Sequence, residues 1–141
     1  MEDKFNLKRF IDAQSNTYER ALYEIKNGTK TSHWMWYIFP QYRNLGRSKT
    51  SIKYAINSKE EAISYLKNPI LGSRLIEITK EFISIENKTA HDVLSGPDDL
   101  KMKSSMTLFD AVQTGNSLFD FVLEKYFEGN RCNRTISKLK S

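Results

Sequence analysis

Residues that begin or end helices divide the 141-residue chain at short intervals, and between them apolar residues recur at helical spacing. No segment shows the sustained alternation of polar and apolar residues between hairpin turns that indicates strands. We therefore predict an all-α fold: one compact domain over residues 1–141, with six to eight short helices in an orthogonal array. The length suits a single domain with a single core.

Caps and breakers set the expected helix boundaries. The residues expected to begin helices are Asn6, Ser32, Ser58, Pro69, Thr89, Asp98 or Asp99, Leu118 and Asn133. The residues expected to end them are Asn27, Pro40, Asn68, Ser95, Gly115 and Gly129. Ser58 and Glu61 have the capping-box pattern, in which each side chain binds the other residue's backbone N–H. The core stripe expected in the helix after Pro69 consists of Leu71, Leu75, Ile78, Phe82 and Ile85.

The composition limits the classes of protein to which the chain can belong. No apolar run approaches the roughly 20 residues of a membrane span, and the polar residues 1–4 lack a signal-peptide pattern. One cysteine, Cys132, excludes an internal disulfide. We expect a cytoplasmic protein with no membrane partner, no metal site and no cofactor. The net charge of +5 suits an anionic partner. The basic residues do not form a dense stripe, so we do not expect nucleic acid to be that partner.

The segment 32–41 holds both tryptophans, a tyrosine and a histidine within ten positions. One interpretation is a helix that simply seeds the core, because aromatic residues dominate cores. The other is a site that binds a planar, polar ligand through Trp34, Trp36, Tyr37 and Gln41. His33 then has three readings: a core histidine with its hydrogen bonds satisfied, a general acid, or a donor to the ligand.

A basic segment over residues 44–56 follows. Gly46 permits a close approach of the backbone. The donors expected to bind phosphate or ribose here are Arg47, Ser48, Ser51 and Lys53, with Tyr54 beside them. The spacing is not that of a P-loop, so we do not expect a nucleoside triphosphatase. The alternative is a polar connecting loop without a site.

Three hydroxyl residues lie in the middle of the predicted helix after Asp98, where Ser and Thr compete for backbone hydrogen bonds. Such departures from local preference often mark sites. We therefore predict that Lys101, Ser104, Ser105 and Thr107 bind an anion. The alternative is that small hydroxyl side chains let two helices approach closely.

These motifs resemble those of a known bacterial family. The residues that carry the resemblance are the run from Ser32 to Gln41, Leu45-Gly46, Tyr54-Ala55-Ile56, Leu71-Gly72, Lys101, the run from Ser104 to Phe109 and Lys125-Tyr126-Phe127. The chain is identified as similar to the family of domain of unknown function 1810, some of whose members are labelled calpastatin. The resemblance implies a small all-helical fold. Asn44 and Arg131-Cys132-Asn133 depart from the family pattern.

A more distant similarity to the NADAR-type N-glycosidase superfamily implies ADP-ribose-like or NAD-derived ligands. Our first hypothesis is a nucleotide-binding protein, in which Arg74 joins the phosphate-binding cations and which sequesters a signalling nucleotide in bacterial or phage defence. The second is an N-glycosidase in which His33 or Lys101 is the acid and Asp98 the carboxylate. The third is a protein-interaction or inhibitor domain with an exposed aromatic patch. An oligomer is compatible with all three.

Overall fold

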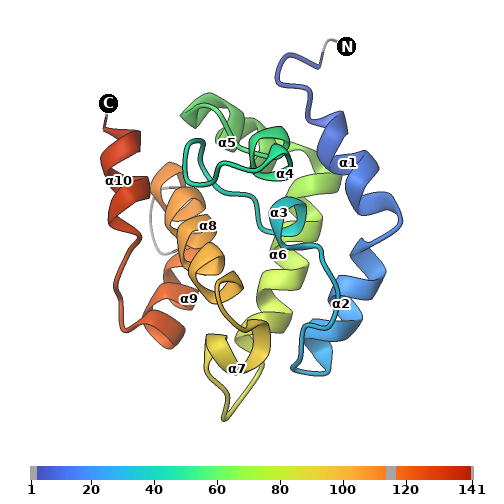
Figure 1. Cartoon of the computed structure of the whole chain (residues 1–141), viewed down its shortest axis with the longest axis vertical. Coiled ribbons are helices and arrows are strands. Elements are labelled where there is room, and N and C mark those ends of the chain that lie inside the picture. Colours follow the sequence, from blue (N-terminus) through green and yellow to red (C-terminus); the bar gives the residue numbers. More distant parts are fainter. Residues whose placement is uncertain (1–2, 114–116, 141) are drawn as a thin grey trace.

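A computed structural model describes residues 3–113 and 117–140 (Figure 1), which contain helices and no strand. Tyr42 and Ile56 form an isolated parallel bridge. The helices are α1 (Lys8–Ser15), α2 (Tyr18–Lys26), α3 (Met35–Ile38), α4 (Lys49–Lys53), α5 (Lys59–Lys67), α6 (Pro69–Ile83), α7 (Ala90–Leu94), α8 (Asp98–Val112), α9 (Leu118–Phe127) and α10 (Asn133–Leu139). The all-α prediction is confirmed. The expected six to eight helices are corrected to ten in the described residues.

Two differences account for most of the change in helix number. The first predicted helix is two helices, because the turn at Asn16 and Thr17 separates α1 from α2. The basic segment 44–56 contains the five-residue α4, which the sequence reading treated as loop. The predicted helix end at Gly115 lies outside the described residues.

The core forms around α6, which packs against α1, α2, α5 and α9. Asn68 caps this helix by accepting from the N–H groups of Ile70 and Leu71, and Pro69 takes the first helical position. The predicted core stripe is buried from Leu71 to Phe82, while Ile85 is partly exposed. Capping and periodicity therefore place this helix as expected.

The second long helix, α8, packs against α5, α7, α9 and α10. Its inner side adds Met102, Met106 and Phe109 to the same core, where the Phe109 ring lies 5.3 Å from that of Tyr65. Figure 1 shows α10 beside α8 at one edge of the molecule, with α1 and α2 at the opposite edge and α3 between them. None of the described helices is both long and apolar enough to span a membrane.

Candidate ligand-binding site

The aromatic segment divides its rings between the core and a pocket. Trp34 is 1% exposed, whereas Trp36 and Tyr37 are half-buried. The indole N–H of Trp34 donates to Glu24, with 2.9 Å between Nε1 and Oε1. Trp34 lines a pocket together with His33 and Trp36, but its ring is almost fully enclosed, so it is the weaker of the two candidates for stacking on a base. Trp36 is the stronger candidate.

Glu24 of α2 holds the start of the aromatic segment. Its carboxylate accepts hydrogen bonds from the backbone N–H groups of Thr31 (2.8 Å) and Ser32 (3.1 Å), and from the Ser32 hydroxyl (2.6 Å). Burial alone raises the pKa of Glu24, but these bonds and that of Trp34 outweigh it and lower the pKa to about 2. The charged carboxylate thus fixes the chain that leads into α3.

A cation–π contact and two ion pairs connect the aromatic segment to the start of α8. The Lys101 ammonium lies 4.1 Å from the centre of the Trp36 ring, within cation–π distance. Lys101 also pairs with Asp98 (Nζ–Oδ1 2.9 Å), whose other oxygen pairs with the largely buried Lys30 (2.8 Å). Burial raises the pKa of Asp98, but the two lysines outweigh that effect and hold it below its usual value. Asp98 is therefore a carboxylate at neutral pH.

A pocket of about 460 Å³ opens between α8, α10 and the loop after Pro40; we call it the central pocket. The predicted site residues that line it are Trp36, Gln41, Arg47, Ser48, Lys101 and Ser104. Its cationic side chains come from the loop (Arg47), from α8 (Lys101) and from α10 (Arg134). No carboxylate lines it within the described residues. The charge of the walls therefore favours an anion.

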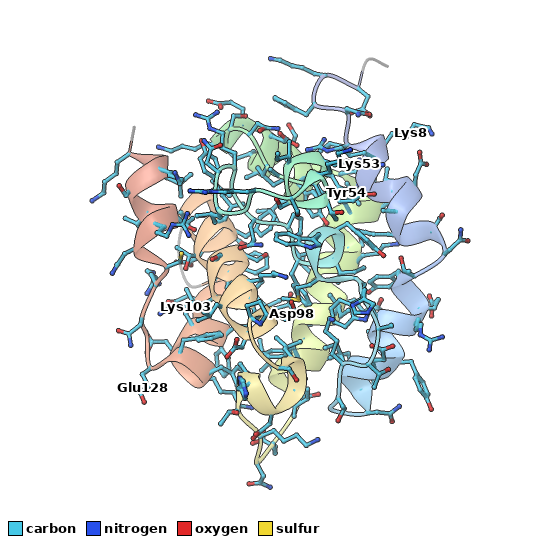
Figure 2. The ribbon with its side chains drawn as sticks, viewed as in Figure 1. Lys8, Lys53, Tyr54, Asp98, Lys103 and Glu128 are labelled. Carbon is cyan, nitrogen blue, oxygen red and sulfur yellow. The ribbon has the colours of Figure 1, made fainter. Side chains whose placement is uncertain are left out.

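Two smaller pockets adjoin the central pocket and share lining residues with it. The one of about 270 Å³, here called the His33 pocket, is lined by the predicted residues His33, Trp34, Tyr37 and Asp98, and shares Trp36 and Lys101 with the central pocket. The other, of about 280 Å³ and here called the α10 pocket, is lined by Lys103, Arg131 and Asn133 among others. In Figure 2 Asp98 lies at the start of α8 toward the middle of the molecule, while Lys103 lies on the side of α10.

The loop before α4 packs tightly against Trp36. A Cβ added at Gly46 would lie 2.8 Å from the Ser51 side chain and 3.3 Å from the Trp36 ring, so the predicted close approach at this glycine is confirmed. The Ser48 hydroxyl caps α4 by accepting from the backbone N–H of Ser51 (3.1 Å). Ser51 is buried beneath it and reaches only a smaller pocket of about 90 Å³, which Tyr54 also lines.

Of the three hydroxyl residues predicted to bind an anion from α8, only Ser104 lines the central pocket. Ser105 is fully buried, and its hydroxyl has no hydrogen-bond partner in the described structure. The Thr107 hydroxyl donates to the Lys103 carbonyl and accepts from the Cys132 N–H (3.0 Å), which anchors the start of α10. The expected anion contacts of Ser105 and Thr107 are therefore corrected to packing and anchoring, because neither hydroxyl faces a pocket.

Two predicted phosphate-binding cations lie elsewhere. Arg74 of α6 donates to the Gln14 side chain (3.3 Å) and lies 5.3 Å from the Tyr18 ring, away from the three pockets. Lys53 is exposed, and Figure 2 shows it with Tyr54 toward α1. Both assignments are corrected, because the packing of α4 and α6 turns these side chains away from the central pocket.

The sequence reading missed the contribution of α10. Arg134 lines the central pocket and donates to the Asn44 carbonyl (3.3 Å), and Cys132 accepts from the Ser104 hydroxyl (3.3 Å). Burial raises the pKa of the Cys132 thiol, but bonds from Ser104 and from the first turn of α10 outweigh it and lower the pKa below its ordinary value. The sequence signal was the pair Arg131 and Arg134 flanking the sole cysteine.

Comparison with known proteins finds relatives that span nearly the whole chain. The model of a family described as "Protein of unknown function (DUF1810)" matches residues 4–139. The crystal structure of the conserved hypothetical protein Rv1873 from Mycobacterium tuberculosis is similar to this chain, with 41% sequence identity, a TM-score of 0.97 and 99% of each chain covered. No curated protein gives a significant match.

Proposed function

Since the chain belongs to the DUF1810 family, whose description assigns no activity, we propose a function from the geometry of the site: binding of a nucleotide-like small molecule in the central pocket. The observation that carries this proposal is the meeting of Arg47, Lys101 and Arg134 from three separate segments around a half-buried indole, with no carboxylate among the described lining residues. Cations suit phosphate, and the Trp36 ring suits a base.

The affinity available to such a ligand is consistent with the proposal. Stacking of one base is worth roughly 1–3 kcal/mol, and each charge-assisted hydrogen bond adds about 1.5–3 kcal/mol. A micromolar dissociation constant needs about 8 kcal/mol, so one stacked base and three charged bonds reach that range if little is lost to ordering. Lys101 and Arg134 are already held in place, by Asp98 and by the Asn44 carbonyl. Sequestration of a signalling nucleotide requires no more than this.

The test is a thermal unfolding screen with NAD, ADP-ribose, cyclic ADP-ribose isomers and cyclic dinucleotides, followed by the mass of the recovered ligand. A ligand at one hundred times its dissociation constant stabilises the fold by about 2.7 kcal/mol. We expect at least one of these compounds to raise the melting temperature and to be recovered unchanged. The variants Trp36→Ala and Lys101→Ala are expected to stay folded and to lose that increase.

Two matched variants control for lost ring area and lost charge. Tyr23 is a 68% exposed aromatic residue of α2, and Lys26 is an exposed cation of the same helix. Tyr23→Ala and Lys26→Ala are expected to keep the full ligand response. If no compound raises the melting temperature, or if the control variants lose the response as fully as Trp36→Ala, the binding proposal is wrong.

One observation favours N-glycosidase activity as a second candidate. Asp98, held as a carboxylate by Lys30 and Lys101, lies in the His33 pocket next to the central pocket. A carboxylate beside the sugar stabilises the positive charge that develops when an N-glycosidic bond breaks, and His33 or Lys101 would protonate the leaving base. A new ligand mass that Asp98→Asn abolishes, with binding retained, would establish this activity in place of simple binding.

A further inference from the structure

The three pockets adjoin one another along α8 and share lining residues, and together we call them the trough. Trp36 and Lys101 line both the His33 pocket and the central pocket. Ser104, Cys132 and Arg134 line both the central pocket and the α10 pocket. The central pocket alone, at about 460 Å³, has the size of a small-molecule site. The trough therefore has room for a ligand that extends beyond the central pocket.

Positive charge along this trough increases toward α10. Lys101 is paired with Asp98, and Arg131 with Asp110 (2.9 Å) and Asp120 (2.5 Å). Arg47, Lys103 and Arg134 pair with no carboxylate in the described part of the chain. They stand in the central pocket, in the α10 pocket and at the junction of the two, respectively.

Asp98 is the one carboxylate among the described residues that line the trough, and it lies in the His33 pocket. The two ends of the trough are therefore chemically different. The carboxylate lies at one end and the half-buried indole lies between that end and the central pocket, while the cations without a carboxylate partner line the central and α10 pockets. A single phosphate in the central pocket would leave Lys103 without a partner.

On the basis of the proposed function, we infer that the ligand is a nucleoside diphosphate or a conjugate of one, with its base at Trp36 and its two phosphates extending from Arg47 past Arg134 to Lys103. Arginine binds adjacent phosphate oxygens through its planar fork, and a lysine acts as a point charge on the second phosphate. The diphosphate linkage passes over Cys132, which lines both pockets at this junction.

The first experiment measures dissociation constants for adenosine, AMP, ADP and ADP-ribose. One additional charge-assisted contact is worth about a factor of ten or more in affinity, so we expect ADP and ADP-ribose to bind about tenfold more tightly than AMP. Lys103→Ala and Arg134→Gln are expected to reduce this ratio toward one. Lys26→Ala, which removes the same charge on α2, is expected to leave the ratio unchanged.

The second experiment uses Cys132, the only cysteine in the chain, as a reporter of position. Saturating ADP or ADP-ribose is expected to slow the alkylation of Cys132 by iodoacetamide, whereas adenosine at saturation is expected to leave the rate unchanged. The readout is the intact mass over time, so it does not depend on the affinity measurement.

The outcomes separate this inference from the proposed function. If AMP and ADP bind equally well and Cys132 is alkylated at the same rate with either, the diphosphate assignment is wrong and nucleotide binding still stands. If none of the four compounds binds, both are wrong. If Lys26→Ala lowers the preference for ADP over AMP as much as Lys103→Ala does, this preference reflects the net charge of the protein. The placement of the second phosphate at Lys103 is then wrong.

Discussion

At the scale of single residues, the two tryptophans show how neighbours in sequence take different tasks. Residues two positions apart do not share a side of a helical turn. Trp34 therefore faces Glu24 in the core, while Trp36 faces Lys101 at the pocket. The composition of the segment does not distinguish the two indoles; the packing of α2 decides that Trp34 is enclosed and that Trp36 stays half-buried.

The Glu24 carboxylate gives the first prediction. Its pKa of about 2 lies below the ordinary value of 4.5, so it stabilises the fold at pH values above 4.5 and loses this contribution as the pH falls toward 2. The size of the shift corresponds to about 3 kcal/mol. We expect Glu24→Gln to lower the free energy of unfolding at pH 7 and to flatten its decline between pH 4.5 and 2. Urea unfolding across this pH range measures both effects.

The control for this prediction is Glu19→Gln, which changes an exposed carboxylate on the same helix. It is expected to leave both the stability at pH 7 and its dependence on pH close to those of the unchanged protein. Equal pH profiles for Glu24→Gln and the unchanged protein would show that the carboxylate does not anchor the aromatic segment.

Ser48 and Ser104 line the central pocket, and the backbone at Gly46 lies close to Ser51 and Trp36, while binding of an anion by these residues stays a prediction. Ser105 is buried away from the pockets. A polar residue in an apolar stretch marks a site and a tight helix contact equally well. Burial alone separates these two cases, and burial depends on the neighbouring helices.

At the scale of elements, start and stop signals predicted most helices, but their detailed bonding differs in places. Ser58 accepts from the Glu61 N–H (3.0 Å) as a capping box requires, yet Glu61 binds the Asn57 N–H (2.9 Å) and Arg9 instead of Ser58. At the first helix, the Asp3 carboxylate accepts from the N–H groups of Leu7 and Lys8, in place of the cap expected from Asn6. In both places another residue takes the expected bond: Arg9 and Asn57 bind the Glu61 carboxylate, and Asp3 takes the place of Asn6.

The crossing of α5 and α6 gives the second prediction. A Cβ added at Gly72 would lie 2.1 Å from the carbonyl oxygen of Leu66, so the two helices meet at a distance that only glycine permits. Alanine usually stabilises a helix interior relative to glycine by about 1 kcal/mol. Here we expect the opposite: Gly72→Ala lowers the free energy of unfolding by about 1–3 kcal/mol through overpacking. Urea unfolding of the variant measures this change.

Ser73→Ala is the matched control, because Ser73 is the next residue of α6 and is exposed. It tests whether any small change in this turn disturbs the helix. A gain in stability for Gly72→Ala, or equal losses for the two variants, would contradict the close crossing.

At the scale of the whole molecule, long-range contacts decide what the local signals leave open. Arg9 of α1 donates to the carbonyls of Lys53 (2.7 Å) and Ala55 (2.7 Å) and pairs with Glu61 of α5 (2.7 Å). This one guanidinium joins the first helix, the end of α4 with the segment that follows it, and α5. Helical periodicity predicts that such elements exist, but it does not specify which of them meet.

The Arg9 contacts give the third prediction. Its side chain is 10% exposed and that of Glu61 is 3% exposed, so removing one partner leaves a buried charge and unpaired carbonyls. We expect Arg9→Met to lower the free energy of unfolding by about 3–5 kcal/mol. Lys8→Met is the control, since its ion pair with Asp12 is exposed and should leave the denaturation midpoint unchanged. Equal midpoints for the two variants would contradict the role of Arg9.

Long-range contacts also limit how much of the candidate site the sequence predicts. Trp36, Gln41 and Lys101, which line the central pocket, belong to aromatic and basic motifs that are legible locally. Arg134 was missed because it is ninety positions from Asn44, whose carbonyl it contacts. The resemblance to a family helped with the fold but supplied no geometry for the pocket.

The position of α10 on the pocket wall has a consequence for the protein during its synthesis. The ribosome releases α10 after every other described helix, so the nascent chain presents Trp36 and Lys101 before it presents Cys132 and Arg134. Until α10 docks, the Trp36 ring and the Lys101 ammonium lack the pocket wall that Cys132 and Arg134 supply. The wall of the central pocket is therefore complete only once α10 has been synthesised and has docked.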